Sequence, residues 1–147
     1  MSSNATPTIH FHMLEGAGFR LDQRRALKAF ITALFKKEKT PLEGLNYIFC
    51  SDDYLLDINR QYLQHDFYTD IITFGLSDKG EPVNGEIYIS VDRVRDNARE
   101  FETSFAREMH RVIFHGALHL CGYKDKKKKE EELIRKMEDK YLRLYKI

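Results

Sequence analysis

The segment from Phe105 to Cys121 constrains the fold most, because its apolar residues recur at helical spacing. They lie three and four residues apart on one stripe, namely Met109, Val112, Ile113, Ala117 and Leu120. Thr103 or Ser104 can cap the start of this helix, and Gly122 can end it. The pattern predicts a central helix that buries its apolar face in the core, while residues on its other faces lie off this stripe.

Shorter patterned segments flank this helix on both sides. Segments rich in β-branched and aromatic residues, or alternating in polarity, predict strands at 8–13, 45–50, 70–76 and 86–91. Apolar spacing and capping residues predict helices at 21–37, 52–63 and 91–100, and a last one with Leu133, Met137, Tyr141 and Leu144 on one side. We therefore expect an α+β fold, a small mixed β-sheet of about four strands packed with about five helices, in which 70–76 and 86–91 form a hairpin.

Size and charge limit the class of protein. The 147 residues suit one domain, 1–147, with a single core. With 24 Lys plus Arg against 23 Asp plus Glu, the net charge of +1 provides no whole-molecule attraction for a polyanion, so any nucleic-acid surface has to be local. The polar start MSSNATPT and the lack of a long apolar run predict a cytoplasmic protein without a membrane segment. Cys50 and Cys121 are expected to be free thiols.

Two histidines lie off the apolar stripe of the central helix, in the segment FHGALHLCGYKD. His115 and His119 stand at i and i+4, so both imidazoles can reach one ion at about 2.0–2.1 Å. Gly122 can adopt the left-handed backbone that turns the chain and brings Asp125 back toward them. The prediction is a metal site of His115, His119 and Asp125, on the central helix and the turn after it. A water at the open fourth position would be acidified, which predicts a hydrolase with one divalent ion, zinc being the expected one.

A histidine pair followed by a glycine turn and a third ligand is also the layout of the metzincin peptidases. In those enzymes a glutamate directly after the first histidine activates the water, whereas this chain has Gly116 there. Peptidase activity is therefore disfavoured, and a metzincin-like metallopeptidase stays as an alternative.

Three motifs together resemble the YbeY family of bacterial rRNA-maturation endoribonucleases. The family hallmark His-Gly-x-Leu-His-Leu-x-Gly-Tyr-Asp-His reads HGALHLCGYKD here, at residues 115–125. The segment NRQYLQHDFYTDIITF at 59–74 looks like the family's Asn-x-x-Tyr-Arg segment leading to Thr-Asp-Val-Leu-Ser-Phe. The segment NGEIYIS at 84–90 looks like its Gly-Asp-Ile-x-Ile-Ser strand. The three motifs occur in the family's order, and the resemblance is continuous from about 45 to 125.

The resemblance implies a metal-dependent, single-strand-specific endoribonuclease. It would act in the maturation of the small-subunit rRNA 3′ end and in ribosome quality control. The implied partners are ribosomal RNA and the small ribosomal subunit, with ribosomal proteins or assembly GTPases as further candidates, and with neither a nucleotide cofactor nor a membrane. Besides His115 and His119, Arg111 and Asp70 are the candidate catalytic residues. The alternative is a non-enzymatic ribosome-assembly factor with a structural metal, in which mutation of His115 would unfold the chain.

The chain departs from the family pattern at two places. The family's third metal-binding histidine falls at Asp125, and its preceding aspartate is replaced by Lys124. A carboxylate ligand shifts the preference toward oxygen-loving ions. Leu63 stands where the family has an arginine thought to help in RNA cleavage, and a nearby Arg60 or Arg111 is the candidate substitute.

Other charged residues near the motif have two interpretations each. Glu108 and Arg111 share a helix face with His115, and each either supports that histidine or forms a surface ion pair. Asp70 is either a cleft carboxylate, as the family implies, or a simple strand-end residue. The basic run 124–129 either meets phosphate or is neutralised by the glutamates at 130–132. The remaining histidines are expected to be structural or at the surface, namely His10, His12, His65 and His110.

Overall fold

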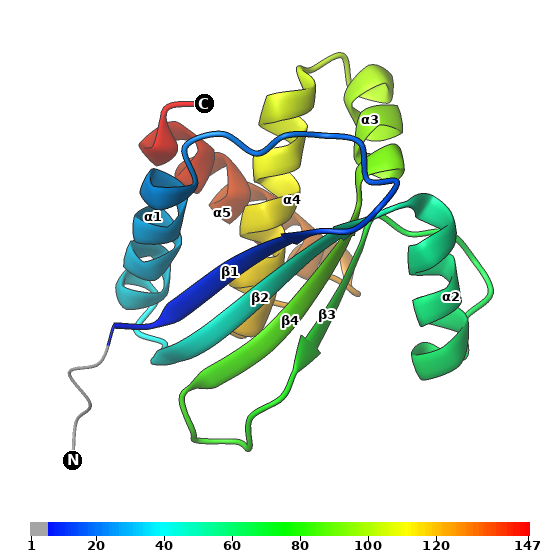
Figure 1. The fold of residues 1–147 in the computed structure, drawn as a ribbon. Helices are drawn as coiled ribbons and strands as arrows, with labels where there is room; N and C mark the ends of the chain where they lie inside the picture. The colour runs from blue at the N-terminus through cyan, green and yellow to red at the C-terminus, as the bar shows by residue number, and fades with distance from the viewer. Residues whose placement is uncertain (1–5) are drawn as a thin grey trace.

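The computed structural model describes residues 6–147 (Figure 1). Its elements are, in chain order, β1 (Thr8–Met13), α1 (Arg24–Lys37), β2 (Leu42–Cys50), α2 (Asp52–Leu63), β3 (Ile71–Gly75), β4 (Val83–Ser90), α3 (Val91–Glu100), α4 (Phe105–Leu120) and α5 (Lys128–Tyr145). The strands form a single four-stranded sheet in the order β1-β2-β4-β3. The α+β fold predicted from the sequence is confirmed.

The sheet is mixed. β1 pairs with β2 and β2 with β4 in parallel, while β3 runs antiparallel to β4. The predicted hairpin is thereby confirmed, with Ile71 opposite Ile89. β2 begins at Leu42 rather than at residue 45, because it has partners on both sides and its ladder to β4 continues across an irregularity between residues 42 and 44. The helix predicted from residue 21 begins at Arg24, since Gln23 adopts a left-handed backbone with φ of 55°.

The main core lies between one face of the sheet and the helices behind it in Figure 1, α1, α4 and α5. Alternate side chains of each strand point into this core, and in β2 these are Leu45, Tyr47 and Phe49. The predicted stripe of α4 is buried, with Leu120 partly so. The hydroxyl of Tyr47 donates a hydrogen bond to the carbonyl oxygen of Ile113 at 2.9 Å, which ties the sheet to α4.

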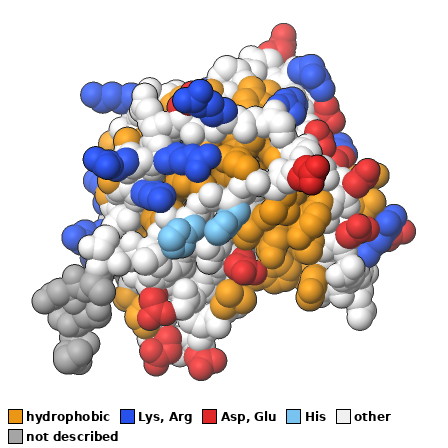
Figure 2. Space-filling model, viewed as in Figure 1, with side chains coloured by type: hydrophobic (Ala, Val, Ile, Leu, Met, Phe, Trp, Pro, Cys, Tyr) orange, Lys and Arg blue, Asp and Glu red, His pale blue; other side chains and the backbone are white. Residues whose placement is uncertain are grey.

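The opposite face of the sheet is only partly covered. α2 packs over a second, smaller cluster that comprises Cys50, Leu55 and Ile72. Figure 2 shows apolar side chains gathered on this side of the molecule, next to histidines. His10 and His12 of β1 are exposed, as predicted, with ring centroids 6.1 Å apart.

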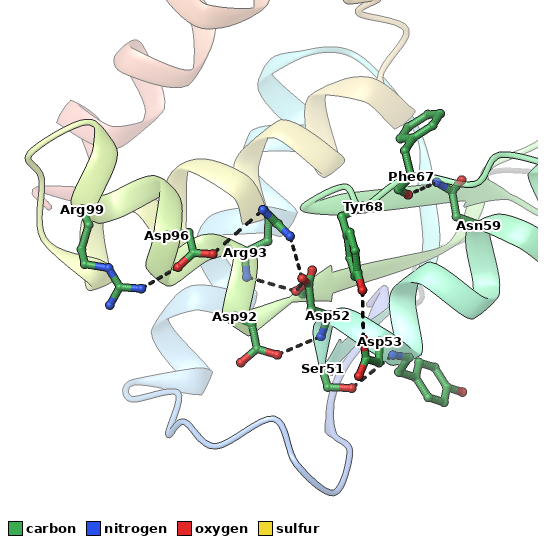
Figure 3. Close-up of polar contacts among 12 residues, drawn as sticks. Ser51, Asp52, Asp53, Asn59, Phe67, Tyr68, Asp92, Arg93, Asp96 and Arg99 are labelled. Atoms are coloured by element: carbon green, nitrogen blue, oxygen red, sulfur yellow. Dashed lines mark hydrogen bonds and ion pairs between the residues drawn. The ribbon is translucent and has the colours of Figure 1, made fainter.

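Polar contacts join the starts of α2 and α3 (Figure 3). The hydroxyl of Ser51 accepts a hydrogen bond from the backbone N–H of Tyr54 at 3.2 Å, which makes it the predicted N-cap of α2. Arg93 of α3 binds the Asp52 carboxylate at 2.6 Å, and the backbone N–H of Asp52 donates to Asp92 at 2.9 Å. These contacts fix α3, which contributes one wall of the candidate site.

Three further expectations concern the whole chain. Cys50 and Cys121 are both free, as predicted. None of the helices formed by residues 6–147 is long and apolar enough to cross a membrane. The polar start, on which the expectation of a chain without a leader depends, lies mostly outside the described residues, since residues 1–5 are not among them.

Candidate metal centre and its cavity

His115 and His119 lie on successive turns of α4, where this helix touches the sheet. The contact is made at Gly116, where an added Cβ would meet Ile87 Cγ2 at 2.9 Å and Ile71 Cδ1 at 3.0 Å. Only a residue without a side chain allows so close an approach. Gly116 therefore faces the sheet, and His115 is turned toward α5.

α4 ends in the glycine turn that the sequence predicts. Gly122 has a φ of 107°. Its backbone N–H donates to the carbonyl of His119 at 3.0 Å, and the N–H of Tyr123 donates to the carbonyl of Leu118 at 3.1 Å. These are the two hydrogen bonds of a Schellman motif. After this turn Asp125 lies beside His115, with its Oδ2 atom 3.2 Å from Nε2 of the imidazole.

His119, the remaining predicted ligand, is exposed. It stands one helical turn beyond His115, and its side chain makes no hydrogen bond or ion pair with any residue in the range 6–147. The structure thus brings His115 and Asp125 together and leaves His119 on the adjoining solvent-facing surface.

Glu138 of α5 holds the other nitrogen of the His115 ring. The Nδ1 atom of His115 lies 2.6 Å from Oε2 of Glu138, whose side chain is only 5% exposed. An Nδ1–H that donates to this carboxylate leaves Nε2 as the atom available to an ion. Burial lowers the pKa of His115, but the hydrogen bond to Glu138 and the charges of Glu138, Asp125 and Asp70 outweigh burial and raise the pKa above its ordinary value.

Arg111 in turn holds Glu138. One guanidinium nitrogen donates to Oε1 of Glu138 at 3.0 Å, and another donates to Asp139 at 2.8 Å. The Arg111 side chain is 13% exposed, so this is a largely buried network rather than a surface ion pair. Arg111 therefore acts on His115 through Glu138.

A cavity of about 420 Å³ opens beside His115, between α3, α4, α5 and the start of β3. The polar and charged residues in its wall include Asp70, Asn97, Glu108, Arg111, Asp125 and Glu138. The Asp70 carboxylate accepts a hydrogen bond from the side-chain amide of Asn97 at 3.1 Å. Burial raises the pKa of Asp70 above its ordinary value. Of the predicted catalytic residues, Asp70, Arg111 and His115 share this cavity, whereas His119 is not in its wall.

Glu138 and Asn97 are the site residues that the sequence patterns did not reveal. A signal for Glu138 exists, since it interrupts a stripe of buried residues on α5 formed with Ile134 and Tyr141. The prediction of which side of α5 faces the core was wrong in part, because Leu133 is 50% exposed and Leu144 is 46% exposed. The buried face of α5 contains the Glu138 carboxylate, so it is less apolar than the stripe predicted from the sequence.

The donor atoms of the site fit a divalent ion in part. Two ligands of a tetrahedral ion with bonds of about 2.0–2.2 Å lie about 3.3–3.6 Å apart, and His115 Nε2 and Asp125 Oδ2 stand at 3.2 Å. Among the side chains of residues 6–147, no three of the His, Cys, Asp and Glu type are arranged as a complete metal site. Completion of the predicted set requires the exposed His119 side chain to turn toward His115.

Two other predicted features lie outside the cavity wall. Arg60 of α2 pairs with Asp66 at 2.5 Å on the surface, and Leu63 is 40% exposed. Arg111 is thus the arginine that lies beside His115.

In the basic run, Glu130 accepts a hydrogen bond from the backbone N–H of Lys127 at 2.9 Å, so one of the neighbouring glutamates caps the start of α5.

Comparisons with known proteins give a consistent result. The family model "Endoribonuclease YbeY" matches residues 17–146. The endoribonuclease YbeY of Cytophaga hutchinsonii is 48% identical over 136 residues, which cover 92% of this chain and 95% of that protein. The protein of the same name from Phocaeicola vulgatus is 56% identical over 98 residues, or 67% of this chain and 70% of that one.

A solved structure also matches. The solution structure of TM1509 from Thermotoga maritima superposes with a TM-score of 0.64 at 30% sequence identity, and the match covers 95% of this chain and 91% of that one. The similarity therefore includes both the sequence over most of the chain and the arrangement of the sheet and helices.

Proposed function

We propose that this chain, which belongs to the endoribonuclease YbeY family, is a metal-dependent endoribonuclease that cleaves single-stranded RNA during ribosomal RNA processing. We place its action at the 3′ end of the small-subunit rRNA and in ribosome quality control. Its partners would then be ribosomal RNA and the small ribosomal subunit. The structural observation that carries the proposal is the approach of His115 Nε2 to Asp125 Oδ2 at 3.2 Å, at the edge of a polar cavity.

His115, His119 and Asp125 would hold one divalent ion, which we propose to be zinc. When bound, such an ion acidifies a water and polarises a phosphoryl oxygen. Glu138 orients the His115 ring, so that Nε2 is presented to the ion rather than to α5. Asp70 is a carboxyl in the cavity wall that is suited to exchange a proton, because burial raises its pKa above its ordinary value.

The basic run supports an RNA substrate. Lysines at 124, 126, 127, 128 and 129 adjoin Asp125 at the start of α5. Positive charge at a helix N-terminus opposes the helix dipole, and a phosphate group bound nearby would offset that cost. These lysines would hold the RNA backbone close to the candidate metal centre.

Nothing in the geometry favours the peptidase alternative. The glutamate of a His-Glu-x-x-His motif would stand at position 116, where even a Cβ would meet Ile87 at 2.9 Å. A residue with a side chain at this position would have to displace the Ile87 and Ile71 side chains or α4 itself. The site therefore has no room for the peptidase base at that position.

The experiment that tests the proposal measures cleavage of a single-stranded RNA, zinc content and thermal melting on the wild type and on His119→Ala. Because the His119 side chain is exposed and unpaired within the described residues, we expect a folded variant that has lost both metal and nuclease activity. His10→Ala, a change at another exposed histidine, is the matched control and should behave as the wild type does. A folded, metal-free variant with undiminished cleavage would disprove the mechanism.

The same measurements address the non-enzymatic alternative. If the metal only stabilised the turn after Gly122, its removal with a chelator would lower the melting temperature, and the loaded wild type would not cleave RNA. We expect cleavage by the loaded protein, with the metal-free protein still folded, because the turn at Gly122 is held by hydrogen bonds between backbone groups of the chain itself.

A further inference from the structure

Glu108 of α4 is a buried carboxylate without a hydrogen-bond partner. Its side chain is 5% exposed, and it lines the cavity beside His115. Its nearest cation is Arg111, whose Nε atom lies 3.9 Å away, beyond hydrogen-bond distance. No donor among residues 6–147 forms a hydrogen bond with this carboxylate. The carboxylate lines the cavity and its oxygens are not fully enclosed, so a ligand in the cavity that carries a donor can reach them.

The neighbouring polar groups in the cavity wall donate their hydrogen bonds to carboxylates other than Glu108. The guanidinium of Arg111 donates to Glu138 and Asp139. The side-chain amide of Asn97 donates to Asp70. The part of the wall formed by Asp70 and Glu108 therefore offers acceptors, and the Asn97 amide and the Arg111 amino groups already donate to neighbouring carboxylates. A ligand that binds against these two carboxylates needs N–H or O–H groups on that edge.

The rim of the same cavity offers a flat surface. Phe101, at the end of α3, is 50% exposed and lines the cavity together with Arg135 of α5. The guanidinium of Arg135 lies 5.7 Å from the centre of the Phe101 ring. Unpaired RNA bases stack on aromatic rings and on guanidinium planes and are read by hydrogen bonds on their Watson–Crick edges. A planar ligand with polar edges suits a cavity built in this way.

The position of Glu108 relative to the candidate metal centre fits one nucleotide. Glu108 precedes His115 by seven residues of α4, which is about two helical turns or 10 Å along the axis. Both residues line the same cavity. A phosphate at His115 and the far edge of its neighbouring base are separated by a comparable distance.

The geometry points to a binding pocket for one unpaired guanine, next to the phosphodiester bond that is cut, with Glu108 as the residue that recognises it. Guanine is the base whose N1–H and N2–H2 donors lie side by side, so both can reach the two oxygens of one carboxylate. Uracil has a single N–H on this edge, while adenine and cytosine each combine an amino group with a ring acceptor that a carboxylate repels. The cavity volume of about 420 Å³ falls in the usual range for small-ligand sites.

This inference rests on the proposed nuclease function, and the test separates the two. The substrate is a short single-stranded RNA of uridines and adenosines with one central guanosine, compared with the same RNA carrying inosine, which lacks only the N2 amino group. Zinc-loaded wild-type protein should cut next to guanosine with a kcat/KM about tenfold or more above that for inosine, as expected for loss of a good base contact. Glu108→Gln should bring this ratio severalfold closer to one. Glu132→Gln, a change at an exposed glutamate of α5, is the control and should leave the ratio unchanged.

Each outcome of the test decides one question. If the wild type cuts neither RNA, the proposed nuclease function fails. If it cuts both equally well, the function stands and the guanine pocket is disproved. If the wild type binds a second Mn²⁺ ion that Glu108→Gln does not bind, and the wild type cuts the guanosine and inosine RNAs equally well, the cavity binds a cation and the inference is wrong. A melting temperature of Glu108→Gln that equals or exceeds that of the wild type excludes misfolding as the cause of lost selectivity.

Discussion

His115 Nδ1 lies 2.6 Å from Glu138 Oε2, so the imidazole is held between this carboxylate and that of Asp125, which lies 3.2 Å from Nε2. This arrangement couples the candidate metal centre to α5. We expect Glu138→Gln to weaken zinc binding about 10- to 100-fold, because partners that orient a metal-binding histidine have effects of this size. Isothermal titration with Zn²⁺ measures the change. Asp139→Asn, which alters a contact of Arg111 but none of His115, is the control, and equal affinities for the two variants would contradict the role of Glu138.

Asp125 stands where the family hallmark has a histidine, so replacement by histidine is an informative change. We expect Asp125→His to keep zinc bound, because imidazole suits zinc, and to reduce the affinity for Mn²⁺, which prefers carboxylates. Asp125→Ala should lose both ions. Competition titrations with the two metals give the affinities. Unchanged zinc binding in Asp125→Ala would remove this residue from the ligand set.

Gly116 sets the distance between α4 and the sheet. Gly116→Ala should destabilise the protein by about 1–3 kcal/mol, because a Cβ would meet Ile87 and Ile71 at 2.9–3.0 Å in a packed core. Urea unfolding measures this cost. In a double-mutant cycle, Ile71→Val removes the Cδ1 atom at 3.0 Å and should make the glycine substitution less costly. Strict additivity of the two substitutions would show that the close contact is not the cause.

His110 should make the protein sensitive to mild acid. Burial lowers the pKa of His110 below its ordinary value, and its Nδ1 atom lies 2.7 Å from the carbonyl oxygen of Ala106. Because the folded-state pKa is the lower one, the neutral ring contributes stability above the unfolded-state pKa of about 6.5, and this contribution is lost as the pH falls through the folded-state value.

The measurement for His110 is the free energy of unfolding between pH 7.5 and pH 5. In the wild type it should fall more steeply with acidification than in His110→Gln, whose side chain does not titrate. The metal-free protein is used in both cases, so that metal release does not contribute to the slope. Parallel curves for the two proteins would rule out His110 as a source of acid sensitivity.

Much of the fold follows from local sequence patterns. Helix α2 begins after its predicted cap Ser51, and α4 ends at Leu120, just before the predicted glycine turn at Gly122, because caps and glycine turns depend on a few adjacent residues. The start of β2 was misplaced, since Glu43 and Gly44 have low strand propensity; Gly44 is in the sheet because it has partners in both β1 and β4, and Glu43 lies at the irregularity of the ladder.

The candidate site was only partly predictable for a related reason. The relation of Asp125 to His115 arises within a short stretch of chain, so helix spacing and the glycine turn were enough to suggest it. Glu138 and Asn97 reach the site from α5 and α3, and no local pattern indicates which face of each helix will meet α4. On α5 two residues of the predicted apolar stripe, Leu133 and Leu144, are exposed, and Glu138 is buried instead because Arg111 and His115, which are distant in sequence, offset the cost of its burial.

The placement of Glu138 on α5 also has a consequence for the order of events during synthesis. α5 comes after the other eight elements of the described chain, and it contributes a wall of the cavity as well as the carboxylate that orients His115. A nascent chain that has produced only the sheet and α4 has both histidines but no support for either. If His115 is the ligand that we propose, the candidate centre is complete only after α5 has left the ribosome and docked, which would delay cleavage of RNA until translation of that helix is over.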